Sequence, residues 1–382
     1  MENNHNQDYI DLRRGFSQEI EPLEEPPSPE EPPKKRIKFA FAPKHSNFFM
    51  LILVLTAIFL QIMLAVVVGT LMVVDPTFQL TDIPTWAMGL GSQILMLGIP
   101  CLIYLLVKRK HIRDILPMRP LGFLNSAMII GMSLMMIPAL MMINIVSQLV
   151  FPNVIGEAMT GVMQEGGIWL SLVIFALVPP VFEEVAFRGI GFVGFRHVKI
   201  GVAAFLNGLL FGAFHMNMNQ FFYAFAGGVI FCYLMYYTKS IWAPILSHFI
   251  VNATGALLTY ALGNIDPEMM AMAAEIDLMQ GGQEVLRLFA GLGIFAVVTM
   301  GIFIGIYIAF KRHNLRRNKA EGIITDTAAA ARAQGLYHVR TFTWSFWVAI
   351  FLLALMMLLI HLGPMLMNMM LYPYQITGAV CG

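Results

Sequence analysis

Nine long apolar runs constrain the fold of this chain more than any other feature of its sequence. A helix crosses the hydrocarbon core of a bilayer with about 20 predominantly apolar residues, and all the runs except the short fifth one approach that length. The runs cover residues 47–74, 84–107, 122–150, 168–195, 200–215, 221–238, 241–262, 289–310 and 342–362. Hydrophobic residues make up 58% of the chain and charged residues only 12%. We therefore predict an all-α fold, a polytopic membrane bundle of about eight or nine transmembrane helices.

The charges between the runs predict the orientation of the chain. Lys and Arg are concentrated in the connections 108–119, 196–199, 239 and 311–319, whereas the connections between them are mainly acidic. Cytoplasmic loops carry the excess of Lys and Arg in membrane proteins. The sequence thus predicts a multi-pass protein of the plasma membrane with a cytoplasmic N-terminus.

Composition along the chain predicts four regions. Residues 1–45 are rich in Pro and Glu and predict a disordered cytoplasmic tail. Residues 46–165 are expected to form N-terminal transmembrane helices, and residues 166–262 a second group of helices that carries ionisable residues. Residues 263–382 are expected to add C-terminal transmembrane helices with a basic cytoplasmic loop.

Charge and cysteine content exclude several classes of function. A net charge of +1 provides no broad basic surface for nucleic acid. The cysteines Cys101, Cys232 and Cys381 form no CxxC pair, so we expect no redox or thiolate–metal site. We expect no cofactor and no metal, and the expected surrounding of the chain is the lipid bilayer.

Ionisable residues within the apolar runs are the strongest functional signal. A charge near the bilayer centre costs at least about 2.5 kcal/mol, so such residues usually serve a function. The fourth run contains Glu183, Glu184 and Arg188, the fifth ends with His215, and the seventh contains His248 and Asn252. At a rise of about 1.5 Å per residue, all three helices bring these side chains close to mid-membrane. The sequence therefore predicts one site inside the membrane.

Helical spacing predicts how these residues face. Glu184 and Arg188 are four residues apart and can pair, whereas Glu183 projects about 100° away and is expected to meet other neighbours. Two interpretations of the Glu184–Arg188 pair remain open, a structural ion pair or a support for the chemistry of Glu183. Phe211 is interpreted as a packing residue.

The motifs Glu183-Glu184-x-x-x-Arg188, Phe211-x-x-x-His215 and His248-x-x-x-Asn252 resemble, in order and context, those of the CPBP (Abi) family of intramembrane endopeptidases. This family includes CAAX prenyl proteases and bacteriocin-processing or immunity proteins. The resemblance covers about residues 168–255. It implies that residues 166–262 are the catalytic helices of a metal-independent glutamic endopeptidase that cleaves membrane-associated or lipidated peptides. The expected partner besides the lipid bilayer is therefore a membrane peptide or protein substrate.

The resemblance also implies a role for each site residue. Glu183 and His215 would activate a water molecule, and His248 and Asn252 would stabilise the oxyanion. Glu184 and Arg188 would support Glu183. The family resemblance favours a cavity that opens to the cytoplasm. Gly189 would then lie near the opening of this cavity.

Two other functions remain open. One Glu and two His can bind zinc in a hydrolase, although no HExxH motif is present. A transporter, immunity or scaffold protein of the same fold could also carry buried ionisable residues. Nothing in the sequence identifies the substrate or shows whether it is prenylated.

Overall fold

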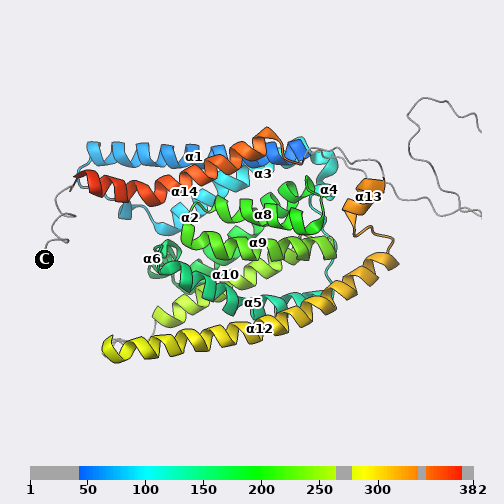
Figure 1. Ribbon diagram of the computed structural model, residues 1–382. Coiled ribbons are helices and arrows are strands. Elements are labelled where there is room, and N and C mark those ends of the chain that lie inside the picture. Colours follow the sequence, from blue (N-terminus) through cyan, green and yellow to red (C-terminus); the bar gives the residue numbers. More distant parts are fainter. Residues whose placement is uncertain (1–42, 264–277, 334–340, 372–382) are drawn as a thin grey trace, which may run out of the picture. The chain divides into compact units, whose positions relative to one another are not determined.

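The computed structural model describes residues 43–263, 278–333 and 341–371, and the regular secondary structure in these ranges is helical (Figure 1). These residues belong to one unit of the chain, 39–382. The main helices are α1 (Pro43–Val74), α2 (Thr85–Gln93), α3 (Ile99–Val107), α4 (Ile112–Ile115), α5 (Phe123–Gln148), α6 (Val154–Ser171), α7 (Val178–Glu184), α8 (Ile200–Phe214), α9 (Met218–Thr238), α10 (Trp242–Gly263), α12 (Leu278–Ala320), α13 (Thr327–Ala333) and α14 (Trp344–Leu371). Wider π-helical turns join some of them: η2 (Ile94–Gly98), η4 (Leu172–Leu177) and η5 (Val185–Gly191).

Eight helical stretches in the described ranges are long and apolar enough to cross a membrane. They correspond to eight of the nine predicted runs. The fifth run forms α8, which has only 15 residues. The predicted all-α polytopic fold is confirmed, and the chain is a multi-pass membrane protein. The predicted tail lies almost wholly outside the described residues, and the division at residues 45, 165 and 262 stays a prediction.

The fourth spanning stretch, Val154–Gly191, contains a kink. Gly167 has φ +70° and ψ −170°, a backbone conformation that favours glycine and breaks the helix. The chain then continues through η4, α7 and η5 to Gly191. Pro179 and Pro180 follow η4 and cannot donate backbone hydrogen bonds, which accounts for a wider turn before them. Glu183 and Glu184 end α7, and Arg188 lies in η5.

Close packing of α8 on α9 positions His215. A Cβ atom at Gly212 would lie 2.8 Å from the carbonyl oxygen of Phe221, and one at Gly208 would lie 3.1 Å from that of Phe225. Only glycine allows the two backbones to approach this closely. His215 follows directly after α8, where the chain turns at Met216 with φ +50°.

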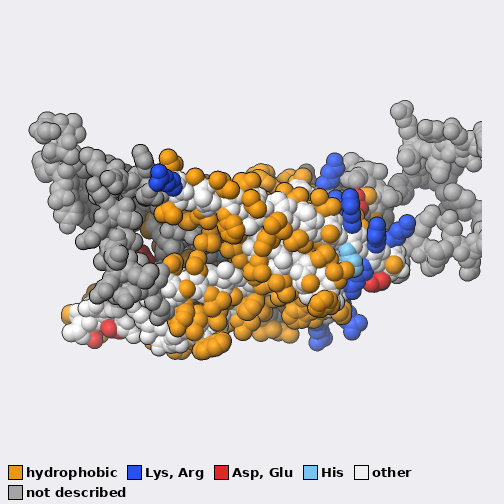
Figure 2. All heavy atoms as spheres, turned by 90° about the horizontal axis from the view of Figure 1, so that it is seen from below, with side chains coloured by type: hydrophobic (Ala, Val, Ile, Leu, Met, Phe, Trp, Pro, Cys, Tyr) orange, Lys and Arg blue, Asp and Glu red, His pale blue; other side chains and the backbone are white. Residues whose placement is uncertain are grey.

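The loops that the sequence predicts to be cytoplasmic meet at one end of the helices. Arg119 donates to the carbonyl oxygen of Thr238 at 3.1 Å and to Asn318 Oδ1 at 2.6 Å. Arg196 donates to the carbonyl oxygen of Asp114, which lies in α4. Figure 2 shows Lys and Arg side chains gathered at this end of a largely hydrophobic surface. We call this end the basic end; its cytoplasmic location stays a prediction.

Candidate active site

The three motif-bearing segments converge on one cavity. It has a volume of about 390 Å³ and lies among α2, α6, α7, α8, α9 and α10. Glu183, His215, His248 and Asn252, the four residues predicted to be catalytic, all line it. The two predicted supporting residues, Glu184 and Arg188, are completely buried next to it. The structure thus brings all six residues together.

Glu183 lies where the motifs meet. Its Oε2 atom is 3.9 Å from Nε2 of His215 and 3.9 Å from Nε2 of His248. These distances are too long for direct hydrogen bonds, but one water molecule can bridge each of them. The other oxygen, Oε1, accepts a hydrogen bond of 3.2 Å from Nε2 of Gln93. One carboxylate oxygen is therefore fixed, and the other faces two imidazoles.

The hydrogen bond of His215 determines which ring nitrogen faces Glu183. Nδ1 of His215 lies 2.8 Å from the carbonyl oxygen of Phe211. Because a carbonyl oxygen only accepts, Nδ1 must carry the proton. In the neutral ring, Nε2 then presents a lone pair towards the cavity. This arrangement allows His215 to accept a hydrogen bond from a water molecule beside Glu183.

The predicted pairing of Glu184 with Arg188 is present. Oε1 of Glu184 lies 2.9 Å from a terminal guanidinium nitrogen of Arg188, and the same oxygen lies 2.9 Å from Nδ1 of His248. Arg188 also donates to the carbonyl oxygen of Gly228 at 3.0 Å. Since all three charged or polar groups are buried, loss of one partner would leave another without compensation.

His248 therefore contacts both carboxylates. The sequence predicts different neighbours for Glu183 and Glu184, and this prediction is wrong for His248, which lies between them. Glu184 holds Nδ1, and Nε2 faces Glu183. The ring also stacks on Phe231, with centroids 5.0 Å apart. A carboxylate on the far nitrogen fixes the ring and stabilises positive charge on it.

Asn252 follows His248 by one turn of α10. Its Nδ2 atom donates to the carbonyl oxygen of Phe175 at 2.9 Å. An amide nitrogen carries two hydrogens, so this bond orients the group while a second N–H exists for a ligand in the cavity.

Two contributions were missed by sequence reasoning. Gln93, from the second run, holds Glu183 and lines the cavity, yet a search for ionisable residues passes over a neutral side chain. Phe211 does more than pack: its ring lies 4.2 Å from the guanidinium carbon of Arg188, a cation–π contact. Its carbonyl also orients His215. A scan for every polar residue within the runs would have found Gln93.

The lining of the cavity shows the direction in which it extends. Beyond the motif residues it is lined by Gly89 and Ser92 of α2 and by Ile155 and Met159 of α6, which lie away from the basic end. Gly189 does not line it. A Cβ atom at this position would lie 2.5 Å from Leu116 Cδ2, so Gly189 is packed against the chain before Pro117. The expectation that Gly189 lies near the mouth is wrong.

The spacing of the His and Glu side chains in the cavity differs from that of ligands around a bound zinc ion. Within the part of the chain that the structure describes, no group of three His, Cys, Asp or Glu residues is arranged to hold a metal ion. The 3.9 Å separations exceed the roughly 3.3 Å expected between two ligand atoms about 2.0 Å from a tetrahedral zinc.

Known proteins are similar to this chain over the segment that carries the three motifs. Residues 165–254 match the family model "Type II CAAX prenyl endopeptidase Rce1-like". The family resemblance is confirmed over this segment. The protein named "Putative membrane peptidase YdiL", from Bacillus subtilis (strain 168), is 30% identical over 84 residues, which are 22% of this chain and 34% of that protein. The chain thus spans about a third of the length of this curated relative. No solved structure matches it significantly.

The matched segment contains every motif residue, from Glu183 to Asn252, but not Gln93. The Rce1-like match and the similarity to YdiL support a membrane protease at the level of the family. The lipid bilayer is the environment that this family and the apolar helices imply.

Proposed function

We propose that this protein is a metal-independent intramembrane endopeptidase that cleaves membrane-associated or lipidated peptides. The observation that carries the proposal is the position of Glu183 Oε2, 3.9 Å from two imidazole nitrogens on the wall of a cavity of about 390 Å³. A carboxylate and a neutral imidazole on either side of one water molecule form a general-base pair.

In the first step, a water molecule between Glu183 and His215 gives a proton to Glu183 as its oxygen attacks the scissile carbonyl carbon. The carbonyl becomes an oxyanion. His248 Nε2–H and Asn252 Nδ2–H donate hydrogen bonds to this oxygen, and Glu184 balances the charge of the His248 imidazolium. Such donors act strongly where water is excluded. The proton on Glu183 then passes to the leaving amine as the C–N bond breaks.

Gln93 and Arg188 have positioning roles in this proposal. Gln93 fixes Oε1 of Glu183, so that Oε2 is the oxygen that accepts the proton. Arg188 holds Glu184, which in turn holds His248. The Glu184–Arg188 pair is therefore both a structural ion pair and a support for the chemistry.

The experiment compares membrane peptides from cells that express the wild type, Glu183→Ala or Glu157→Ala. Glu157 is an exposed carboxylate that does not line the cavity, so its variant is a matched control. Uncleaved substrates should accumulate only with Glu183→Ala. Unchanged peptides would instead support a transporter, immunity or scaffold protein.

Chelation separates the proposal from a zinc hydrolase. Cleavage of an identified substrate should persist after dialysis against a strong chelator. Loss of cleavage that zinc restores would show that His215, His248 and Glu183 bind the metal.

A further inference from the structure

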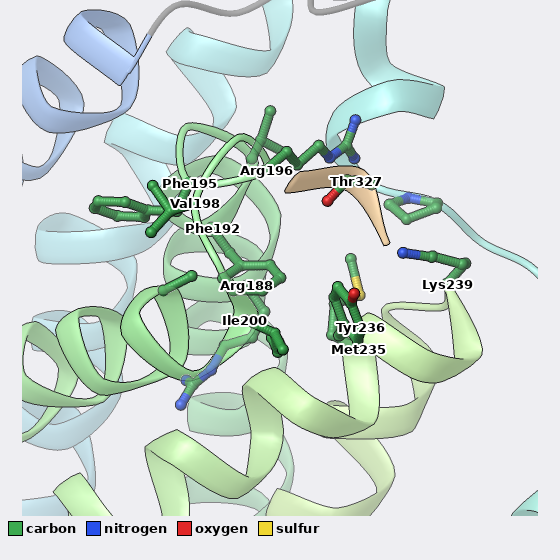
Figure 3. A pocket seen from close by; sticks show the side chains of 13 residues that line it. Arg188, Phe192, Phe195, Arg196, Val198, Ile200, Met235, Tyr236, Lys239 and Thr327 are labelled. Atoms are coloured by element: carbon green, nitrogen blue, oxygen red, sulfur yellow. The ribbon is translucent and has the colours of Figure 1, made fainter. Parts of the chain in front are cut away.

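A second cavity lies at the basic end of the helices. It is lined by Arg188 of η5, the turn 192–198 that follows η5, the start of α8, the end of α9, Pro117 and the first residue of α13. The space open to the centre of a water molecule is about 40 Å³, more than one water needs. Figure 3 shows Arg196 and Lys239 reaching towards Thr327 from different sides. The stem of Arg188 lines the same cavity, whereas its guanidinium pairs with Glu184.

The lining of this cavity is cationic. It includes Arg188, Arg196 and Lys239 but no Asp or Glu. Arg188 is paired within the catalytic site. In the described ranges, no carboxylate lies within 4.0 Å of the charged atoms of Arg196 or Lys239. Two cations thus share one small cavity without a direct counter-ion.

Each cation is held by a backbone carbonyl oxygen, and one carboxylate that is not in direct contact acts on each charge, Asp114 on Arg196 and Asp326 on Lys239. Nζ of Lys239 donates to the carbonyl oxygen of Thr325 at 3.2 Å and lies 4.4 Å from the centroid of Tyr236. Arg196 donates to the carbonyl oxygen of Asp114. Burial, and next the charge of Arg196, lower the pKa of Lys239 to about 7, although Asp326 acts in the opposite direction. An anion in the cavity would remove this mutual repulsion.

We propose that this cavity binds the phosphate group of an anionic ligand between Arg196 and Lys239. Both side chains donate charge-assisted hydrogen bonds to phosphate oxygens, and the Thr327 hydroxyl adds a third donor. An anionic lipid headgroup and inorganic phosphate share this chemistry. The lipid is the source that the surroundings favour, because the exposed side chains of Arg109, just before α4, and Arg113, in α4, lie at the same end and attract an anionic membrane surface.

The test measures ligand binding by the full-length protein after delipidation in detergent. Native mass spectrometry and thermal unfolding are followed below pH 7, at constant ionic strength, with phosphatidylglycerol, phosphatidylcholine or inorganic phosphate. The variants are Lys239→Gln and Arg196→Gln. Lys110→Gln is the control, since it removes an exposed charge from the same end outside the cavity.

The wild type and Lys110→Gln should bind phosphatidylglycerol and unfold at a higher temperature, and binding should be at least about tenfold weaker in Lys239→Gln and Arg196→Gln. Stabilisation by inorganic phosphate alone, with the same dependence on Lys239, would identify a free ion as the ligand. Equal binding by all variants, or equal effects of the two lipids, would overturn the proposal.

Two milder variants cover the case in which the neutral ones do not fold. Lys239→Arg should retain binding, and Thr327→Val should weaken it about threefold or more, since it removes one donor. Full binding by Thr327→Val together with loss in Lys239→Arg would contradict a phosphate held by these donors. Because the measurement is binding, a protein without peptidase activity would give the same result.

Discussion

The catalytic cavity and the cavity at the basic end contain opposite chemistry, although Arg188 contributes to the surroundings of both. In the larger cavity, a carboxylate of Glu183 faces two imidazoles, so protons can move between neighbouring groups. In the smaller cavity, Arg196 and Lys239 face one another without a carboxylate in the lining. The first arrangement suits catalysis and the second suits anion binding. The difference shows that a buried charge indicates a function only once its partners are known.

The largest expected effect is a loss of cleavage in variants of the residues that line the larger cavity. Glu183→Gln, His215→Ala and His248→Ala should each lower the cleavage rate by about 1000-fold or more, because general-base catalysis and oxyanion stabilisation are lost. The rate is measured with purified protein and a substrate peptide. Circular dichroism should show an unchanged helical content. Cleavage by Glu183→Gln at the wild-type rate would exclude Glu183 as the base.

Arg188 links the two cavities, and its removal should mainly affect stability. Arg188→Ala leaves Glu184 buried without its cation, which typically costs about 3–5 kcal/mol. Thermal unfolding should show a large decrease for Arg188→Ala and a partial recovery for Arg188→Ala with Glu184→Gln.

The double variant also tests the role of Glu184 in catalysis. It should remain slow in cleavage, because Gln cannot stabilise a His248 imidazolium as a carboxylate does. A stable and fully active Arg188→Ala protein would contradict both the ion pair and its support of His248.

Asn252 should contribute less than the three residues above. Asn252→Ala removes one of two oxyanion donors, and loss of one such donor typically lowers kcat by about 100-fold to 1000-fold. The measurement is kcat with the same peptide. Thr254→Ala, on the same helix but outside the cavity, is the control. An unchanged kcat in Asn252→Ala would show that Asn252 does not stabilise the oxyanion and that His248 is its donor.

Gln93 comes next. Gln93→Leu removes a hydrogen bond to an ionised carboxylate, worth about 1.5–3 kcal/mol, so kcat should fall about 10-fold to 100-fold. The side chain is a positioning residue, and Gln93→Glu should be worse than Leu, because it brings a second carboxylate to Glu183. Gln148→Leu, the same change at an exposed glutamine outside the cavity, should retain full activity. Similar rates for the Leu and Glu variants would argue that Gln93 only fills space.

These residues also show how far the sequence alone can lead. The membrane fold and the grouping of Glu183, His215, His248 and Asn252 could be predicted, because ionisable side chains in apolar helices are costly and rare. The contact of His248 with both carboxylates could not, since it depends on how α10 approaches α7. Gln93 was missed because it is a neutral amide in a run without ionisable residues, whereas the amide Asn252 lies one helical turn after His248.

The smaller cavity gives the smallest expected effect, a dependence of stability on pH. The pKa of Lys239 is lowered to about 7 in the folded protein, whereas an unfolded Lys titrates near about 10.4. Between these values the unfolded state binds more protons, so the free energy of unfolding should rise as the pH increases from about 7 towards 10.

Other groups titrate too, so the measured quantity is the difference between the wild type and Lys239→Gln in thermal unfolding. That difference should shift in favour of the wild type as the pH rises, and a bound anionic lipid should reduce the shift, because it stabilises the charged ammonium. A difference that does not change with pH would mean that Lys239 keeps an ordinary pKa, and the contrast between the two cavities would then rest on geometry alone.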